Sequence, residues 1–191
     1  IQHLSWPEGQ SINDYISDEL ATVSYSSVDV ALGIVLDVGV GAEMAKSDIK
    51  SAFRLLPVHP EDFELLGIHF REQWYVDKAL PMGCSISCAL FETFSTFLEW
   101  VFSQETGSDK VTHYLDDFFF VGSPGSADCQ RYLASFKELM EYMGVPLAME
   151  KTVGPDTAMT FLGIEIDSKF MVARLPEDKQ KAMLALIATM L

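Results

Sequence analysis

The sequence predicts a domain of the α+β class, in which helices lie on one face of a largely antiparallel sheet. Segments with apolar residues at three- and four-residue steps predict amphipathic helices. Short apolar runs between turn residues predict strands joined as hairpins. The two kinds of segment alternate along 191 residues, 49% of them hydrophobic, which is enough for a buried core without disulfide support.

The first half of the chain is expected to contain one helix, one isolated strand and one hairpin. In order, the segments are a loop over 3–14, a helix over 27–38, a strand over 43–49 and two strands within 65–78. Ser26 and Asp29 resemble a capping box at the start of the helix, and Gly39 follows its end. The two strands of the last segment are joined through Arg71 and Glu72.

The second half is expected to alternate helices and hairpins. In order, the segments are a helix that follows Ser85 and Ser87, a hairpin over 111–122, a helix over 127–143, a hairpin over 159–175 that turns at 167–169, and a terminal helix opened by Pro176. The first of these helices has the strongest pattern, because Phe91, Phe94, Leu98 and Phe102 recur at helical steps.

The charge of the chain is strongly negative. Lys and Arg total 13 against 28 Asp and Glu, which gives a net charge of −15, and neither Lys nor Arg occurs before Lys46. Affinity for nucleic acids depends largely on Lys and Arg that meet phosphates. Composition taken alone therefore argues against a nucleic-acid partner.

The cysteines and the hydropathy of the chain indicate its cellular environment. Its three cysteines, Cys84, Cys88 and Cys129, form no CxxC pair, which is typical of a reducing, intracellular environment. The spacing of Cys84 and Cys88 would also allow a shared metal, although core packing is the favoured interpretation.

No run of 18 apolar residues occurs, so we expect no membrane span. A start at Ile1 without a basic leader predicts no signal peptide and an excerpt of a longer chain.

Two adjacent aspartates, Asp116 and Asp117, lie in the apolar run HYLDDFFFVG, where desolvating a carboxylate is costly and two of them repel. Three explanations are open: a turn with solvated acids, a pair for acid–base catalysis, or a site for divalent cations. The phenylalanines that follow disfavour a solvated turn, and adjacent strand residues point to opposite faces, which disfavours an acid–base pair. For a metal site, Asp48 is the candidate third carboxylate, and three such groups can hold two ions about 4 Å apart.

Six segments of the chain form an ordered set of motifs. They are HLSWPEGQSIN, KSDIKSAFRLLPVHP, LPMGCSISCALFETFSTFLEW, HYLDDFFFVG, MGVPLAMEKTVGP and FLGIEID. Taken in order, this set resembles reverse transcriptases of retroelements, in which the six segments are similar to the end of the fingers, motif A, motif B, the YxDD motif C, motif D and the primer-grip hairpin. The amino-acid sequences of these motifs most resemble those of the tyrosine-recombinase (DIRS-type) class of retrotransposons.

The resemblance implies a polymerase palm, an antiparallel sheet backed by helices, with partial fingers and the start of a thumb. Residues 1–42 would be partial fingers and the entry to the palm, 43–158 the palm with motifs A to D, 159–175 the primer-grip-like hairpin, and 176–191 the start of the thumb or connection. The implied activity is that of an RNA-directed DNA polymerase, a nucleotidyltransferase. Its partners would be an RNA or DNA template with a DNA primer, deoxynucleoside triphosphates, and the missing fingers, thumb and RNase H parts of a parent polyprotein.

The resemblance also implies roles for individual residues. Asp48, Asp116 and Asp117 would hold two Mg²⁺ ions, or Mn²⁺ in their place, with the Ile49 carbonyl completing the shell. Lys151 would lie near the pyrophosphate and could protonate it. Nucleotide binding would involve the amides of Lys50, Ser51, Ala52 and Phe53, the Phe53 ring as a gate against a 2′-OH, and the loop at Met82 and Gly83. The residues implied to lie near the template and primer are Tyr114, Leu162 and Gly163.

Some features leave other interpretations open. Met82 stands where many retroviral relatives carry Gln, so a polar contact to the nucleotide is missing. Together with the acidic N-terminal segment, this leaves a catalytically silent retroelement-derived domain that binds other proteins as the second hypothesis. Another palm-type enzyme, such as a nucleotidyl cyclase, is the third. Individually, Phe53 could be an ordinary core residue and Lys151 a solvated surface residue.

Overall fold

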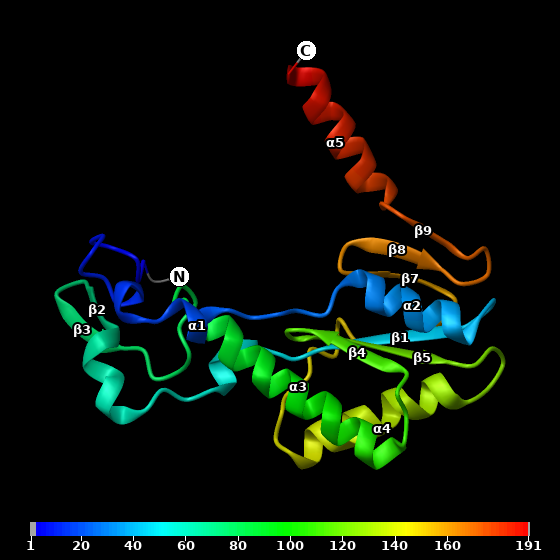
Figure 1. Cartoon of the computed structure of the whole chain (residues 1–191), viewed down its shortest axis with the longest axis horizontal. Helices are drawn as coiled ribbons and strands as arrows, with labels where there is room; N and C mark the ends of the chain where they lie inside the picture. Colours follow the sequence, from blue (N-terminus) through cyan, green and yellow to red (C-terminus); the bar gives the residue numbers. More distant parts are fainter. Residues whose placement is uncertain (1–2, 191) are drawn as a thin grey trace.

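The computed structural model describes residues 3–190, so the outermost residues of the predicted segments 1–42 and 176–191 lie outside the described part. Its centre is a four-stranded antiparallel sheet in the order β4-β5-β1-β6 (Figure 1). In chain order the strands are β1 (Glu43–Asp48), β4 (Val111–Tyr114), β5 (Asp117–Gly122) and β6 (Val153–Asp156). The α+β class predicted from the sequence is confirmed.

Helices cover both faces of this sheet. Helices α3 (Ser87–Thr106) and α4 (Asp128–Tyr142) lie below it in Figure 1, whereas α2 (Val28–Val38) lies above it. The expectation of helices on one face is therefore wrong. The physical reason is β5, whose residues 118–121 are all apolar and fully buried. A strand without alternating polar residues needs cover on both sides.

The two faces of β5 belong to separate hydrophobic clusters. Phe118 and Phe120 pack among residues of α3 and α4, and the Phe120 and Phe136 rings lie 5.0 Å apart. Phe119 and Val121 pack against α2 and the C-terminal strands, where the Phe119 and Phe161 rings stack at 4.7 Å. The segment HYLDDFFFVG thus packs into both hydrophobic clusters of the core.

The C-terminal strands form a three-stranded meander rather than the single expected hairpin. They are β7 (Ala158–Phe161), β8 (Ile164–Asp167) and β9 (Val172–Arg174), in that order. The missed turn lies at Leu162 and Gly163, which both have positive φ, 45° and 81°. Ser168 fixes the meander to the rest of the chain, because its hydroxyl donates to the Ala42 carbonyl at 2.6 Å.

A second, smaller lobe lies at the other end of the molecule (Figure 1). Its short elements are η1 (Asn13–Tyr15), α1 (Asp18–Ala21), η3 (Pro60–Leu66), β2 (Gly67–Phe70) and β3 (Gln73–Val76), and η2 (Ala52–Leu55) lies in the connection from β1. The predicted hairpin within 65–78 is confirmed, with Arg71 and Glu72 both at positive φ, as a two-residue hairpin turn requires.

The predicted helices are present with small shifts at their ends. α2 begins one residue later than its capping pattern indicated, because Ser27 rather than Ser26 accepts the Asp29 amide, at 3.2 Å. The Ser26 hydroxyl instead lies 2.8 Å from that of Thr112. The terminal helix, α5 (Glu177–Met190), projects away from the sheet and buries none of its described residues.

None of the helices between residues 3 and 190 is long and apolar enough to cross a membrane. Within the same residues Cys84, Cys88 and Cys129 are free thiols, and Cys129 is the one that is fully buried.

Candidate active site

The sheet brings the three predicted carboxylates to one of its ends. Asp48 is the last residue of β1 and lies directly opposite Asp117, the first residue of β5, in antiparallel register. Asp116 occupies the two-residue turn between β4 and β5, after Leu115. The Ile49 amide donates to the Asp116 carbonyl at 3.0 Å, which ties the end of β1 to this turn. Residues far apart in sequence thus lie at the same end of the sheet.

These carboxylates are crowded and partly desolvated. Asp48 is buried, and Asp116 and Asp117 are half-buried. Burial raises the pKa of Asp117 to about 6, and the neighbouring charges of Asp116 and Asp48 add to this rise. Burial, with a contribution from Asp48, also raises the pKa of Asp116. Such an arrangement favours a bound cation, which would relieve the repulsion.

Two lysines already approach this negative charge. Lys151 Nζ donates to Asp48 Oδ2 at 2.7 Å, and this hydrogen bond is the main reason why the pKa of Lys151 is raised. Lys46 Nζ donates to the Thr160 carbonyl at 2.7 Å and partly offsets the rise in the pKa of Asp117. Sequence reasoning missed Lys46. The available signal was its position two residues before Asp48, on the same face of the strand.

The site fits divalent cations in chemistry, although its side chains are not gathered around one point. Among residues 3–190, no group of three or more His, Cys, Asp or Glu side chains is arranged to hold an ion. The donor type fits, because carboxylate oxygens on adjoining strand ends are ligands that Mg²⁺ and Mn²⁺ prefer. Asp48 would have to turn from Lys151 toward Asp116 and Asp117 to share an ion with them.

The segment after Asp48 contains the predicted triphosphate cradle. Ser51 has a φ of 62° and precedes the η2 turn, in which Ala52 and Phe53 are the first residues. Amides at such a start have no partner within the turn. The Lys50 amide donates to the Pro146 carbonyl at 2.8 Å, so in this structure it is not available to a phosphate.

Phe53 is half-buried and contacts the motif B helix. Its ring meets that of Phe91, on α3, edge-on at 5.1 Å. The side chain is therefore partly a core residue and partly a surface residue. The contact with Phe91 fixes the ring against α3.

The loop at Met82 and Gly83 is held by a residue that sequence reasoning missed. Gly83 has a φ of 110°, which favours glycine. Asn13 Nδ2 donates to the Gly83 carbonyl at 2.9 Å, and the Ser85 amide donates to Asn13 Oδ1 at 2.9 Å. Nothing in the sequence connects Asn13 with a loop that lies 70 residues further along the chain.

Met82 borders a pocket of the small lobe rather than the carboxylates. This pocket has a volume of about 580 Å³, and its lining includes Arg54 and Asp77, which form an ion pair at 2.7 Å. None of the three aspartates is among its lining residues. Two of the charged groups in this pocket are thus already engaged with each other.

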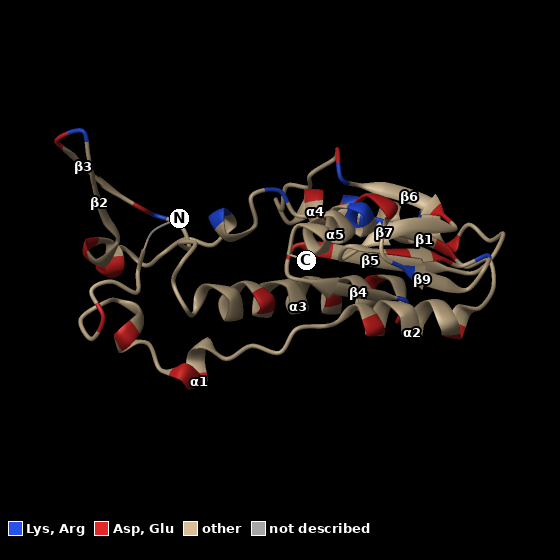
Figure 2. Cartoon of the chain, turned by 90° about the horizontal axis from the view of Figure 1, so that it is seen from above, with Lys and Arg blue, Asp and Glu red and all other residues tan. Residues whose placement is uncertain are grey.

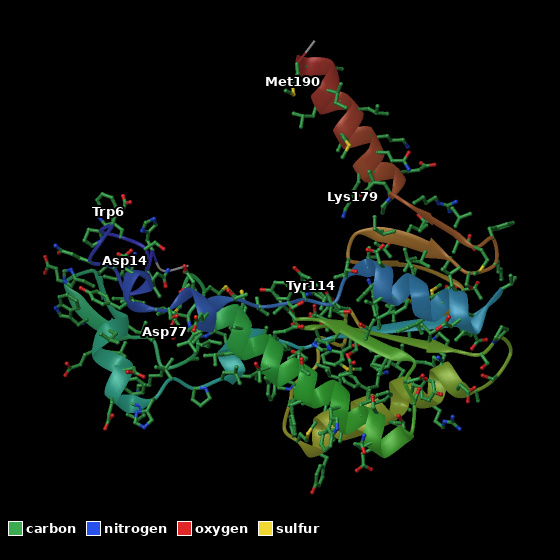
Figure 3. The ribbon with its side chains drawn as sticks, in the orientation of Figure 1. Trp6, Asp14, Asp77, Tyr114, Lys179 and Met190 are labelled. Atoms are coloured by element: carbon green, nitrogen blue, oxygen red, sulfur yellow. The ribbon has the colours of Figure 1, made fainter. Side chains whose placement is uncertain are left out.

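Tyr114 and Leu162, both predicted to lie near template and primer, line one pocket. Its volume is about 480 Å³, and the N-terminal end of α2 forms its other wall. The Tyr114 ring packs against Tyr25 at 5.0 Å. Figure 3 labels Tyr114 at the end of the sheet that faces the small lobe, and Lys179 at the base of α5. Lys179 Nζ lies over Gly163, the residue after Leu162.

An antiparallel sheet between helices, with acids gathered at the end of two adjacent strands, defines the palm type of polymerase fold. Residues 14–166 match the family described as reverse transcriptase (RNA-dependent DNA polymerase). The chain therefore belongs to the reverse transcriptase family.

Two viral proteins are similar to this chain in sequence. Protein P of duck hepatitis B virus (strain China) is 28% identical over 149 residues, and that of heron hepatitis B virus is 27% identical over 142 residues. These matches cover 78% and 69% of this chain, but the chain spans only 18% and 17% of the length of those proteins.

The fold is similar to that of foamy viral protease–reverse transcriptase. The structure of that protein in complex with double-stranded DNA superposes with a TM-score of 0.73 and 17% identity, over 91% of this chain and 28% of the other. Its complex with an RNA/DNA hybrid gives a TM-score of 0.64 and 19% identity, over 80% and 20%.

Proposed function

We propose that this chain is the palm, with part of the fingers, of an RNA-directed DNA polymerase that extends a DNA primer with deoxynucleotides. The observation that carries the proposal is the register of β1 against β5, which sets Asp48 opposite Asp117 with Asp116 in the adjoining turn. Membership of the reverse transcriptase family supports it. Nucleic acid in the foamy viral structures supports a template and primer as partners.

In this proposal the three carboxylates, with the Ile49 carbonyl, hold two Mg²⁺ ions, for which Mn²⁺ could substitute. Bound ions would supply charge stabilisation for the attacking and leaving oxygens of phosphoryl transfer. The chain's own groups orient the substrates. The amides of Ser51, Ala52 and Phe53 face the phosphates. The ring of Phe53 excludes a 2′-OH.

Other side chains serve the leaving group and the primer. Lys151 is 59% exposed and can move from Asp48 to a pyrophosphate oxygen, to which it can give its proton. The pocket between Tyr114 and Leu162 receives the primer end, with Gly163 allowing its backbone to approach closely. Met82 contacts the nucleotide only through apolar surface.

The chain spans a minor part of its relatives, so we propose that it works within a longer polypeptide. That polypeptide would supply the remaining fingers, the thumb and an RNase H part. An intracellular location and a tyrosine-recombinase (DIRS-type) element stay predictions from the sequence. A recombinase-coding region in the same reading frame would support the second of these, and its absence from the complete element would contradict it.

Primer extension tests the proposed activity. The assay uses an RNA template, a DNA primer, low salt, and Mn²⁺ or Mg²⁺, with the chain as given and with the parent polypeptide. Asp116→Asn should abolish incorporation, whereas Asp109→Asn, which removes the same charge from a side chain that is 85% exposed, should leave it unchanged.

Either of two results would contradict the proposal. Incorporation that persists in Asp116→Asn would exclude the metal-binding role of the acids. Absence of incorporation by both the chain and its parent would favour the silent, protein-binding domain, for which the acidic surface is the supporting observation.

A further inference from the structure

The motif B helix carries two acids on the side that faces the catalytic hairpin. Glu92 and Glu99 lie on α3, and Glu92 is only 7% exposed, in line with the buried residues Phe91, Ser95 and Leu98. Burying a carboxylate is costly unless it is hydrogen-bonded or paired. Neither acid has a part in the proposed chemistry, so their contacts need another explanation.

Glu92 makes its contacts to the turn between β4 and β5. The Leu115 amide donates to Glu92 Oε2 at 3.2 Å. Glu92 Oε1 lies 3.2 Å from His113 Nε2, a buried nitrogen that has no hydrogen-bond partner within residues 3–190. One carboxylate thus touches the hairpin at its backbone and at a side chain.

His113 connects Glu92 with Glu99. The imidazole is buried, its Nδ1 lies 2.5 Å from Glu99 Oε2, and its ring stacks on Phe118 at 5.4 Å. The ring therefore stands between two carboxylates of the same helix. His113 thus contacts both acids, whereas Glu92 also accepts the Leu115 amide.

Leu115, whose amide donates to Glu92, has a strained backbone conformation. Leu115 has a φ of 51°, which is unfavourable for a residue with a side chain. Asp116 follows it directly, and the Asp116 carbonyl receives the Ile49 amide on the other side. Two hydrogen bonds thus hold the peptide units on either side of Asp116. One runs from the Leu115 amide to Glu92, and the other runs from the Ile49 amide to the Asp116 carbonyl.

We propose that Glu92 is a positioning residue for the catalytic hairpin. Its carboxylate accepts the Leu115 amide and so holds Leu115 in the left-handed conformation. Glu99 contacts His113 but not Leu115, so it serves as the matched comparison. The proposal rests on the proposed polymerase function for its catalytic consequence, but its structural part stands on the Leu115 contact alone. Side chains that support a ligand of this kind typically change activity 10- to 100-fold when they are removed.

A matched pair of variants tests the proposal in the parent polypeptide and in the chain as given. Glu92→Met and Glu99→Met each replace one acid beside His113 by an apolar side chain of similar length, but only the first removes the acceptor of the Leu115 amide. Glu92→Gln is the conservative variant, because its amide oxygen can still accept that hydrogen bond. Melting temperature is measured for each variant.

Two readouts separate positioning from general stability. Amide hydrogen exchange of Leu115 should speed up at least roughly tenfold in Glu92→Met and stay slow in Glu99→Met and Glu92→Gln. In primer extension, kcat should fall about 10- to 100-fold in Glu92→Met, with KM for the deoxynucleotide unchanged, and should recover most of its value in Glu92→Gln.

The outcomes distinguish failure of this proposal from failure of the polymerase assignment. Protected Leu115 exchange in Glu92→Met would overturn the proposal, as would equal losses of kcat and melting temperature in both Met variants. If the unsubstituted protein does not extend a primer but Leu115 exchange behaves as expected, the positioning contact stands and the polymerase assignment fails. If the Glu92→Met protein does not fold, Glu92→Gln is compared with Glu99→Met instead. Loss of Leu115 protection in Glu92→Gln but not in Glu99→Met would then overturn the proposed role of the Glu92 acceptor oxygen.

Discussion

Asp117 begins a strand of buried phenylalanines and is itself half-buried, opposite Asp48 and next to Asp116. Its pKa is raised to about 6 by burial and by the charges of Asp116 and Asp48. A folded-state pKa above the unfolded value of about 4 means that the folded protein binds more protons between these pH values. The charged form of Asp117 therefore destabilises the metal-free fold.

We predict that the metal-free protein loses stability as the pH rises from 5 to 7. The Asp117 contribution should be about 1 kcal/mol, after allowance for solvent screening of a half-buried group. Urea unfolding in EDTA at both pH values measures it. Asp117→Asn should be the more stable protein at pH 7 and should reduce this pH dependence, and an unchanged dependence in that variant would contradict the assignment.

The clustering of the three aspartates at one end of the sheet could be predicted from the sequence, whereas the side chains that hydrogen-bond to the neighbouring turns could not. Asp48, Asp116 and Asp117 are conspicuous because charged residues interrupt apolar strands. Glu92 and Asn13 act through backbone groups at Leu115 and Gly83, which are 23 and 70 residues away. Almost any residue type can supply a backbone amide or carbonyl, so the identities of Leu115 and Gly83 do not reveal these contacts.

At the scale of elements, the end of β5 and the start of α4 approach closely. A Cβ on Gly122 would lie 2.3 Å from the Cys129 amide nitrogen and 2.7 Å from the Cys129 Cβ. We predict that Gly122→Ala destabilises the protein by about 1–3 kcal/mol, as overpacking in a core does. Chemical denaturation measures the change.

Gly33 provides the matched control for this substitution. It lies within α2 and has no atom within 4 Å of the position that a Cβ would take. Gly33→Ala should therefore stabilise the protein by about 0.5–1 kcal/mol, through helix propensity. Loss of stability in both variants would show that the spacing of α4 on β5 is not the cause.

The contact between η1 and the Gly83 loop gives a functional prediction for a positioning residue. Asn13 uses both ends of its amide, one on the Gly83 carbonyl and one on the Ser85 amide. Asn13→Ala should raise KM for the incoming deoxynucleotide roughly 5- to 10-fold, the effect of losing about one hydrogen bond of loop restraint. Steady-state primer extension measures it.

Asn13→Asp is the graded control, because it keeps the acceptor for Ser85 and loses the donor to Gly83. Its KM should lie between those of the unsubstituted protein and Asn13→Ala. A KM that is unchanged in both variants would show that the loop needs no restraint from the small lobe.

The elements were predictable where periodicity was strong and less so where it was short. Helices α2, α3 and α4 and the β2–β3 and β4–β5 hairpins lie where the pattern put them. The turn at Leu162 and Gly163 was missed, because one apolar run continues through it. β6 was missed because Gly154 and Pro155 are typical of loops rather than strands.

At the scale of the whole molecule, shape and charge give different indications of a partner. Figure 1 shows a sheet-based body, a smaller lobe at one end and the helix α5, which projects away from the sheet. Figure 2 shows Asp and Glu distributed over most elements, whereas Lys and Arg occur at few places. The lysines nearest to the acids, Lys46 and Lys151, are both engaged in hydrogen bonds.

This distribution predicts weak binding of nucleic acid with a small dependence on salt. The logarithm of affinity falls with the logarithm of salt concentration by about 0.9 for each phosphate neutralised on a duplex. With few free cations near the site, we expect a slope of about −3 or smaller in magnitude for an RNA template paired with a DNA primer. Fluorescence anisotropy between 25 and 200 mM salt would measure it, and a slope several times steeper would contradict this account of the surface.

Two lysines of α5 test whether the slope reports contacts near the primer-grip-like turn. Lys179 Nζ lies over Gly163, whereas Lys181 is paired with Glu177 at 3.0 Å on the same helix. Lys179→Gln should reduce the magnitude of the slope by about 1, because one phosphate contact is lost, and Lys181→Gln should leave it unchanged. Equal effects would mean that the net charge of −15, rather than the position of each lysine, sets the affinity. In that case the cations that hold the template would have to come from other parts of the parent polypeptide.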